Sequence, residues 1–160
     1  MTMRLKLYTL LCASFLFLFT SCNQDDDPVP PEAGSKTVLV YIVADNSLAS
    51  FAKEDVEEMI EGMKLVGSSS CNLLVYQDDR NTPVLFRIAK DKKGNVEKEV
   101  IKEYAEQVST DVSVMKEVMH RAFYEYPADS YGLVYWSHAD GWIPYPVPSA
   151  STRWIGQDKG

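Results

Sequence analysis

Residues 37–43 read TVLVYIV, and this uninterrupted run of β-branched and aromatic side chains decides the fold class. Such residues favour β-strands, and a strand that is apolar without alternation is covered on both faces. Residues 72–77, NLLVYQ, and residues 131–136, YGLVYW, have the same character. The sequence therefore predicts three buried strands of a sheet that carries helices on both sides.

Two segments between these strands have apolar side chains at three- and four-residue spacing, which is typical of amphipathic helices. Gly67 is expected to stop the first helix. The second is expected to be capped near Ser109 or Thr110 and closed by Pro127. The apolar positions are Ala52, Val56, Met59, Ile60, Met63 and Val66 in the first, and Met115, Val118, Met119, Ala122 and Phe123 in the second.

The remaining elements complete an α/β fold. Residues 84–88 alternate, and residues 96–101 follow a turn at Gly94-Asn95, which predicts a hairpin on the rim of the sheet. A strand, a helix and a strand in succession form a right-handed crossover, so the outcome is a three-layer fold with a mostly parallel sheet. Residues 131–136 would then form an exposed apolar edge, which folded proteins avoid. We therefore expect that only the N-terminal part of the domain is present.

The first 35 residues are expected to lie outside this domain. Residues 1–21 combine a basic start with an apolar run too short to span a membrane, as in a secretory signal. The small residues before Cys22 resemble a bacterial lipobox, in which the cysteine is acylated, and the acidic run after it resembles the export tract of Bacteroides-group surface lipoproteins. Residues 22–35, acidic and then rich in Pro and Gly, predict a tether. Residues 36–160 remain as the domain of a lipid-anchored protein of the outer membrane or cell surface.

Charge and cysteine content exclude several classes of function. The chain has 16 basic and 23 acidic residues, and removal of residues 1–21 takes away two basic residues and no acidic one, which leaves a net charge of −9. Such acidity argues against nucleic acid or an anionic lipid surface as partner. Cys12 is lost with the signal and Cys22 would carry lipid, so only Cys71 stays in the domain. Neither a disulfide framework nor a thiolate-rich metal site is expected.

His138 is the strongest candidate for chemistry because it follows a predicted strand directly. Ligands of open α/β sheets bind at the carboxyl ends of the strands, where Asp45, Ser137 and Asp140 would form a rim. A histidine there can exchange a proton near pH 7. By position alone, a catalytic and a structural role are equally supported. His120 is expected on the solvent face of a helix, without a function.

The partner of His138 is not evident from the residues. There is no G-x-S-x-G turn for a serine nucleophile, and a metal site needs further independent ligands, since Asp140 is too near in sequence to count as one. A cysteine thiolate remains. Cys71 is unsuitable, since it precedes a strand and should lie at the opposite end of the sheet as a small buried apolar residue.

Several segments resemble the clostripain family of cysteine peptidases. They are residues 37–48, residues 126–138 and Gly141-Trp142, and residues 75–80 and 152–158 are similar to further family segments. The resemblance spans residues 37–160. It implies a caspase-like sheet and an endopeptidase that cleaves proteins or peptides after Arg or Lys. It also implies that His138 is the catalytic histidine and that the backbone N–H of Ala139, where the family usually has Gly, helps to bind the oxyanion.

The same resemblance implies what lies outside the chain and what acts on it. The nucleophilic cysteine and an acidic specificity residue are expected beyond Gly160, so the 160 residues alone should be inactive. Arg153 is expected to mark a maturation cleavage. No cofactor is required, and Ca²⁺ is suggested by the resemblance alone. A non-catalytic surface lipoprotein that uses the sheet as a binding module is the alternative, and a metal-dependent hydrolase is a more distant one.

Overall fold

The computed structural model describes residues 34–66, 71–139 and 155–158. The predicted signal peptide and most of the tether therefore lie outside the described residues. The described elements follow one another as β1 (Lys36–Val43), α2 (Ala49–Leu65), β2 (Cys71–Asp78), β3 (Val84–Lys90), β4 (Val96–Glu103), α3 (Val112–Glu125) and β5 (Ser130–Trp136). This order matches the predicted succession of strand, helix, strand, hairpin, helix and strand.

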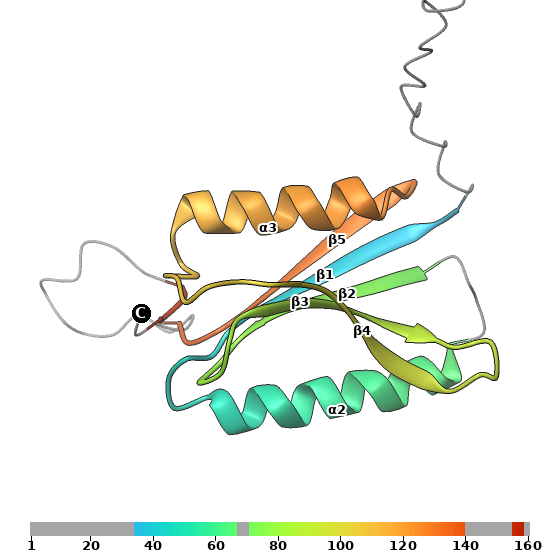
Figure 1. Ribbon diagram of the computed structural model, residues 1–160, viewed down its shortest axis with the longest axis horizontal. Coiled ribbons are helices and arrows are strands. Elements are labelled where there is room, and N and C mark those ends of the chain that lie inside the picture. Colours follow the sequence, from blue (N-terminus) through green and yellow to red (C-terminus); the bar gives the residue numbers. More distant parts are fainter. Residues whose placement is uncertain (1–33, 67–70, 140–154, 159–160) are drawn as a thin grey trace, which may run out of the picture. The chain divides into compact units, whose positions relative to one another are not determined.

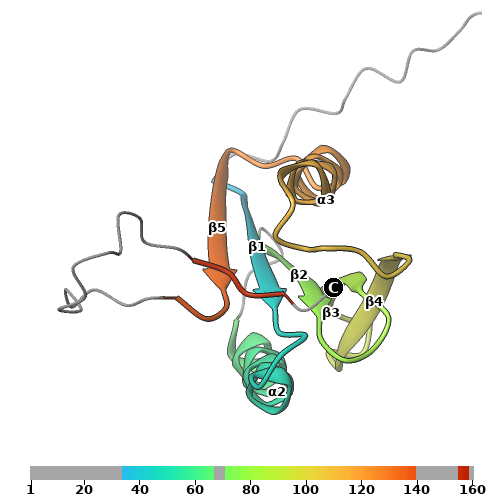
Figure 2. The ribbon, with the colours of Figure 1, turned by 90° about the vertical axis from the view of Figure 1, so that its left-hand side faces the viewer.

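The five described strands form one sheet in the order β4-β3-β2-β1-β5. β1 is parallel to both β2 and β5, while β3 runs antiparallel to β2 and to β4. Four of the five strands thus point the same way. α3 covers one face of the sheet and α2 covers the other (Figure 1; Figure 2). The prediction of a three-layer α/β fold with a mostly parallel sheet is confirmed.

Alternate side chains of β1 enter two separate cores. Leu39, Tyr41 and Val43 point to the α3 side, and Val40 and Ile42 to the α2 side. Each is buried, with at most 7 % of its surface exposed. Burial on both faces explains why residues 37–43 are apolar without interruption. The hairpin between β3 and β4 turns as predicted, since Gly94 has a φ of +89°, a left-handed conformation that favours glycine.

β5 is an edge strand, as expected, but the prediction that it is buried on both faces is wrong. Tyr131, Leu133 and Val134 are between 44 % and 51 % exposed. Among the described strands β5 has only β1 as a neighbour, and the helices pack mainly on other strands, α2 on β3 and β4 and α3 on β1. Continuous apolarity therefore indicated a strand correctly but did not show how much of it the described residues cover.

Two smaller predictions are also wrong. The N-cap of α3 is Asp111, whose side chain accepts a hydrogen bond from the Ser113 N–H at 2.7 Å, rather than Ser109 or Thr110. Ser109 is instead fully buried, with hydrogen bonds to Tyr76 and Asp78 of β2. Cys71 is a free thiol at the start of β2, as expected, but it is half-buried rather than buried, because the first residues of this strand are less covered than its centre. None of the described helices has the length and apolarity to cross a membrane.

Candidate active site

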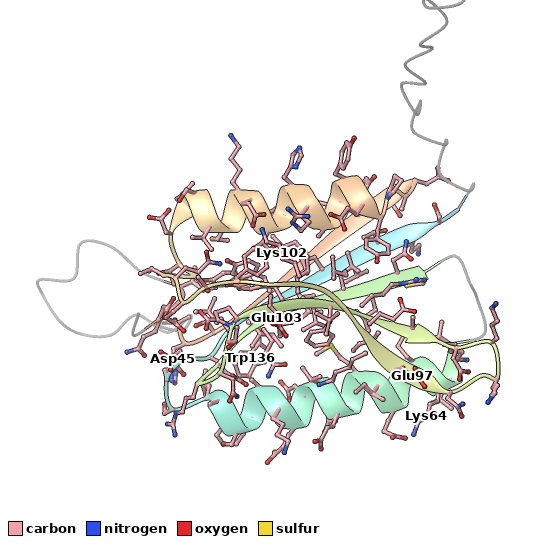
Figure 3. The ribbon with its side chains drawn as sticks, viewed as in Figure 1. Asp45, Lys64, Glu97, Lys102, Glu103 and Trp136 are labelled. Atoms are coloured by element: carbon pink, nitrogen blue, oxygen red, sulfur yellow. The ribbon has the colours of Figure 1, made fainter. Side chains whose placement is uncertain are left out.

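The carboxyl ends of β1, β2 and β5 meet at one edge of the sheet. The last residue of β1, Val43, pairs with Asp78 at the end of β2, and Ile42 pairs with Trp136 at the end of β5. Figure 3 shows Trp136 and Asp45 at this end of the molecule. Asp45 is half-buried just beyond β1, and nothing in the described part of the chain forms a hydrogen bond with it. The predicted site is thus assembled where parallel strands end.

The loop between β1 and α2 is fixed by hydrogen bonds of its own. The Ala44 N–H donates to the Asp78 carbonyl at 2.6 Å, and the Asn46 N–H donates to the Ala44 carbonyl at 2.6 Å. The Asn46 side chain, only 2 % exposed, accepts from the Leu48 N–H at 2.8 Å. This side chain-to-backbone turn places Ser47 directly before Leu48, the N-cap residue of α2.

His138 lies two residues after β5 and faces this loop. Its Nε2 is 3.0 Å from the Ser47 hydroxyl oxygen. The imidazole is half-buried, and its Nδ1 has no hydrogen-bond partner in the described residues. On the preceding residue, the Ser137 hydroxyl donates to the Val43 carbonyl at 2.9 Å and so ties the end of β5 to the end of β1. The histidine therefore has one nitrogen engaged and one available.

Residues 155–158 return across the same edge of the sheet, where Figure 2 shows them passing the ends of β5 and β1. Ile155 forms an antiparallel bridge with Ala139, and the Gly156 N–H donates to the His138 carbonyl at 2.8 Å. The Gln157 N–H donates to the Ser137 hydroxyl at 3.0 Å. These contacts fix the backbone around His138 from a second side.

Ala139 keeps the donor that the resemblance assigns to it. The bridge to Ile155 uses the His138 carbonyl and the Gly156 N–H. No acceptor for the Ala139 N–H is found among the described residues, and Ala139 is exposed. A backbone N–H that has no described acceptor and lies next to a histidine is the kind of group that can bind a developing oxyanion.

A buried polar cluster lies beneath the site on the α3 side of the sheet. The Ser109 hydroxyl donates to one carboxyl oxygen of Asp78 and accepts from the Tyr76 hydroxyl, while the Tyr41 hydroxyl donates to the Ser109 carbonyl at 2.9 Å. The Ser109 N–H donates to Asp158 of the returning segment. The cluster therefore connects the core of the sheet to the residues that flank His138.

The Asp78 carboxyl is fully buried, and its second oxygen has no hydrogen-bond partner in the part of the chain that the structure describes. Burial raises its pKa from 3.8 to about 7. The hydrogen bond from Ser109 opposes this rise, and the nearby carboxylates of Asp158, Glu106 and Asp45 add to it. Burial likewise raises the pKa of Tyr76, which keeps its hydroxyl protonated as a donor.

A cysteine that could act as nucleophile is not found beside His138 among the described residues. Cys71 begins β2 opposite Lys36 of β1, so it lies at the amino end of the parallel strands, roughly 20 Å from the edge that carries His138. Nor do three His, Cys, Asp or Glu side chains within the described ranges lie close enough to hold a metal ion. Ca²⁺ binding, which the resemblance suggested, stays a prediction. Asp140, Arg153 and Cys22 lie outside the described residues.

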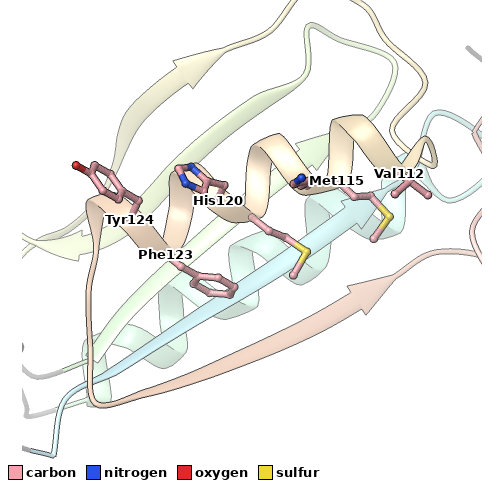
Figure 4. Close-up of a pocket in the computed structure, with 7 residues that line it drawn as sticks. Val112, Met115, His120, Phe123 and Tyr124 are labelled. Atoms are coloured by element: carbon pink, nitrogen blue, oxygen red, sulfur yellow. The ribbon is translucent and has the colours of Figure 1, made fainter.

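An apolar groove of about 700 Å³ lies along α3 (Figure 4). Its lining is Val112, Met115, Lys116, Met119, His120, Phe123 and Tyr124. His120 is exposed there, as predicted, with its ring stacked on Tyr124. Phe123 contacts Tyr131 of β5 edge to face, with ring centroids 4.9 Å apart, so the groove borders the exposed strand.

Sequence reasoning placed His138, Ser137 and Asp45 at this edge of the sheet, as the structure does, but did not point to Ser47 or to the buried role of Ser109. Ser47 could have been noticed because it follows a predicted strand end by four residues, in the region where ligands of such sheets bind. Ser109 gave no comparable signal, since its hydrogen-bond partners are between 31 and 68 residues away in the sequence.

Comparison with known proteins agrees with this geometry. The fold and the histidine at the strand ends define an α/β protein of the caspase-like kind. The sequence pattern of the clostripain family matches residues 40–160. The chain therefore belongs to the clostripain family of cysteine peptidases. No curated protein matches it.

Solved structures give the same assignment. The chain is 56 % identical to a cysteine protease of B. fragilis, over 71 % of this chain and 97 % of that one, with a TM-score of 0.66. It is 57 % identical to a secreted C11 cysteine protease of Bacteroides thetaiotaomicron in complex with an irreversible peptide inhibitor, over 79 % of this chain and 35 % of that one, with a TM-score of 0.69. An inactive zymogen C11 protease of Parabacteroides distasonis is 36 % identical over 72 % of this chain and 34 % of its own, with a TM-score of 0.64. The chain thus spans about a third of the length of the last two.

Proposed function

We propose that the protein is an exported cysteine endopeptidase that cleaves after Arg or Lys, with His138 as its catalytic base. The observation that carries the proposal is the position of His138. It stands at the carboxyl end of a parallel strand, with Nε2 held by Ser47 and Nδ1 unengaged within the described residues. Membership of the clostripain family and the similarity to a secreted relative support peptidase chemistry and export.

The proposed reaction uses a cysteine that the described residues do not contain. His138 takes the thiol proton, and the thiolate attacks the carbonyl carbon of the scissile bond. The Ala139 N–H helps to hold the oxyanion. As the C–N bond breaks, His138 gives its proton to the leaving amine. Water then loses a proton to His138 and hydrolyses the acyl-enzyme, which restores the thiol.

The substrate preference, the place of the nucleophile, the maturation cleavage and the lipid anchor are proposed from the resemblance. Beyond Gly160, an acidic pocket is proposed to select Arg or Lys through charge-assisted hydrogen bonds, and the nucleophile is proposed to lie there too, so that the 160 residues alone would be inactive. Cleavage at Arg153 is proposed to accompany maturation. Acylated Cys22 is proposed to anchor the protein in the outer membrane, and no metal or cofactor is invoked.

The test is hydrolysis of fluorogenic peptides by the full-length protein. Substrates with Arg or Lys before the scissile bond should be cleaved, and the matched peptide with a neutral residue should not. His138→Ala should lower kcat/KM by at least about 10³-fold. His120→Ala, which changes the exposed histidine of α3, should leave it unchanged. A thiol alkylator should abolish hydrolysis while a chelator does not. Full activity in His138→Ala would contradict the proposal.

A second candidate function is a non-catalytic binding module. It is favoured by one observation, the exposed apolar edge of β5 beside the α3 groove. An extended peptide could add to such an edge as a further strand. In that case a basic peptide would bind the full-length protein without being cleaved, and the His138→Ala variant would bind it equally well.

A further inference from the structure

The loop that carries Ser47 and the segment after β5 that carries His138 are both restrained by hydrogen bonds. On one side the Asn46 side chain fixes the loop, since it accepts from the Leu48 N–H at 2.8 Å and donates to the Gln157 carbonyl at 2.7 Å. On the other side the Ser137 hydroxyl and the Gly156 N–H fix the backbone of β5's end. The 3.0 Å contact between the Ser47 oxygen and the His138 Nε2 therefore joins two restrained segments that are 91 residues apart in the sequence.

This contact can set which imidazole nitrogen exchanges a proton. A neutral imidazole has one N–H and one lone pair, and the hydrogen bond at one nitrogen decides which form is populated. If the Ser47 oxygen accepts from Nε2–H, Nδ1 carries the lone pair and can take a proton. If the Ser47 hydroxyl donates to Nε2, Nδ1 carries the hydrogen and cannot act as a base.

Only the first arrangement persists through a catalytic cycle. When Nδ1 gains a proton, both nitrogens become donors, and a hydroxyl that already accepts from Nε2–H needs no rotation. Ser47 is exposed, so its own hydrogen can bond to solvent. A hydroxyl that donated to Nε2 would have to rotate whenever Nε2 gained or lost a proton. A preorganised site avoids such a rotation.

We propose that Ser47 is a positioning residue whose hydroxyl oxygen accepts a hydrogen bond from the Nε2–H of His138, so that Nδ1 is the nitrogen that exchanges the proton during catalysis. The proposal rests on the proposed peptidase function for its catalytic consequence. Its structural content, the form of the imidazole, is independent of that function.

The direct test is ¹⁵N-histidine NMR of the full-length protein at a pH where His138 is neutral. The signal that disappears in His138→Gln is assigned to His138. We expect the hydrogen on Nε2 in the wild type, a mixture of the two forms in Ser47→Ala, and the wild-type form in Ser47→Thr, which keeps the hydroxyl. Ser50→Ala is the matched control, because Ser50 is exposed and lies three residues along the chain, in the first turn of α2. A hydrogen on Nδ1 in the wild type, or an unchanged spectrum in Ser47→Ala, would overturn the proposal.

Kinetics test the catalytic consequence separately. Ser47→Ala should lower kcat up to about tenfold, the effect of one hydrogen bond, with KM unchanged, and Ser47→Thr should restore it. An equal loss in Ser50→Ala, or no loss in Ser47→Ala, would refute a positioning role. If His138→Ala is fully active, the proposed function fails instead, and the NMR spectra still decide the Ser47 contact.

Discussion

The buried carboxyl of Asp78 is expected to make the stability of the protein fall as the pH rises. Its pKa in the folded state is about 7, above the 3.8 of the unfolded chain. Below about pH 4 both states hold the proton, and no stability is lost. Between the two values only the folded state keeps it, so the free energy of unfolding falls with pH. Above pH 7 the loss is complete, and it amounts to about 4 kcal/mol, at about 1.4 kcal/mol for each unit of pKa.

Asp78→Asn removes this titration while keeping the shape of the side chain. The new amide destabilises the folded state by about 1–3 kcal/mol at every pH, because its N–H₂ group would stand at the second carboxyl oxygen, which no described acceptor faces. The free energy of unfolding in urea, measured from pH 4 to pH 8, should therefore shift in favour of Asp78→Asn by about 4 kcal/mol across that range.

Asp91→Asn is the matched control for this measurement. Hydrogen bonds from the Asn95 side chain and from neighbouring backbone groups lower the pKa of Asp91, so this carboxyl is ionised in both states above pH 5. Its substitution should show no trend from pH 5 to pH 8. A difference between wild type and Asp78→Asn that stays constant over the same range would refute the reasoning.

Three further substitutions test the fold, each by urea unfolding of the full-length protein. Leu39→Ala should destabilise the protein by about 2–5 kcal/mol because Leu39 is fully buried. Leu65→Ala is the control, since Leu65 is 88 % exposed, and it should change the stability by less than about 0.5 kcal/mol. Equal effects of the two substitutions would contradict the burial of Leu39. Asp111→Ala should cost about 1 kcal/mol through loss of the α3 cap, and Asp111→Asn should recover most of it. Gly156→Ala should destabilise the protein by about 1–3 kcal/mol, because the φ of Gly156 is +98° and the new methyl group would meet the Tyr135 hydroxyl. An unchanged stability would argue against this placement of residues 155–158.

The positions of several candidate site residues could be predicted from local patterns in the sequence. Strand ends can be located from the sequence because an apolar run stops where polar residues begin, and this placed Ser137 and His138 beyond β5 correctly. The rule that parallel strands present their carboxyl ends to ligands then placed Asp45 at the same edge. The cap of α3 was misplaced because Ser109, Thr110 and Asp111 are all suitable cap residues, and only packing shows that Ser109 is buried with Asp78.

The sequence by itself determined the elements, the three layers and the histidine at a strand end, because the periodicity of apolar side chains and the positions of turn residues are local properties. Only the tertiary structure decided that β5 lies beside β1 and is left exposed, that Ser47 contacts His138, and that Asp78 is buried under Ser109. These contacts join residues between 31 and 94 positions apart. They depend on the order of the strands and on the packing of helices over the sheet, which no short stretch of sequence contains.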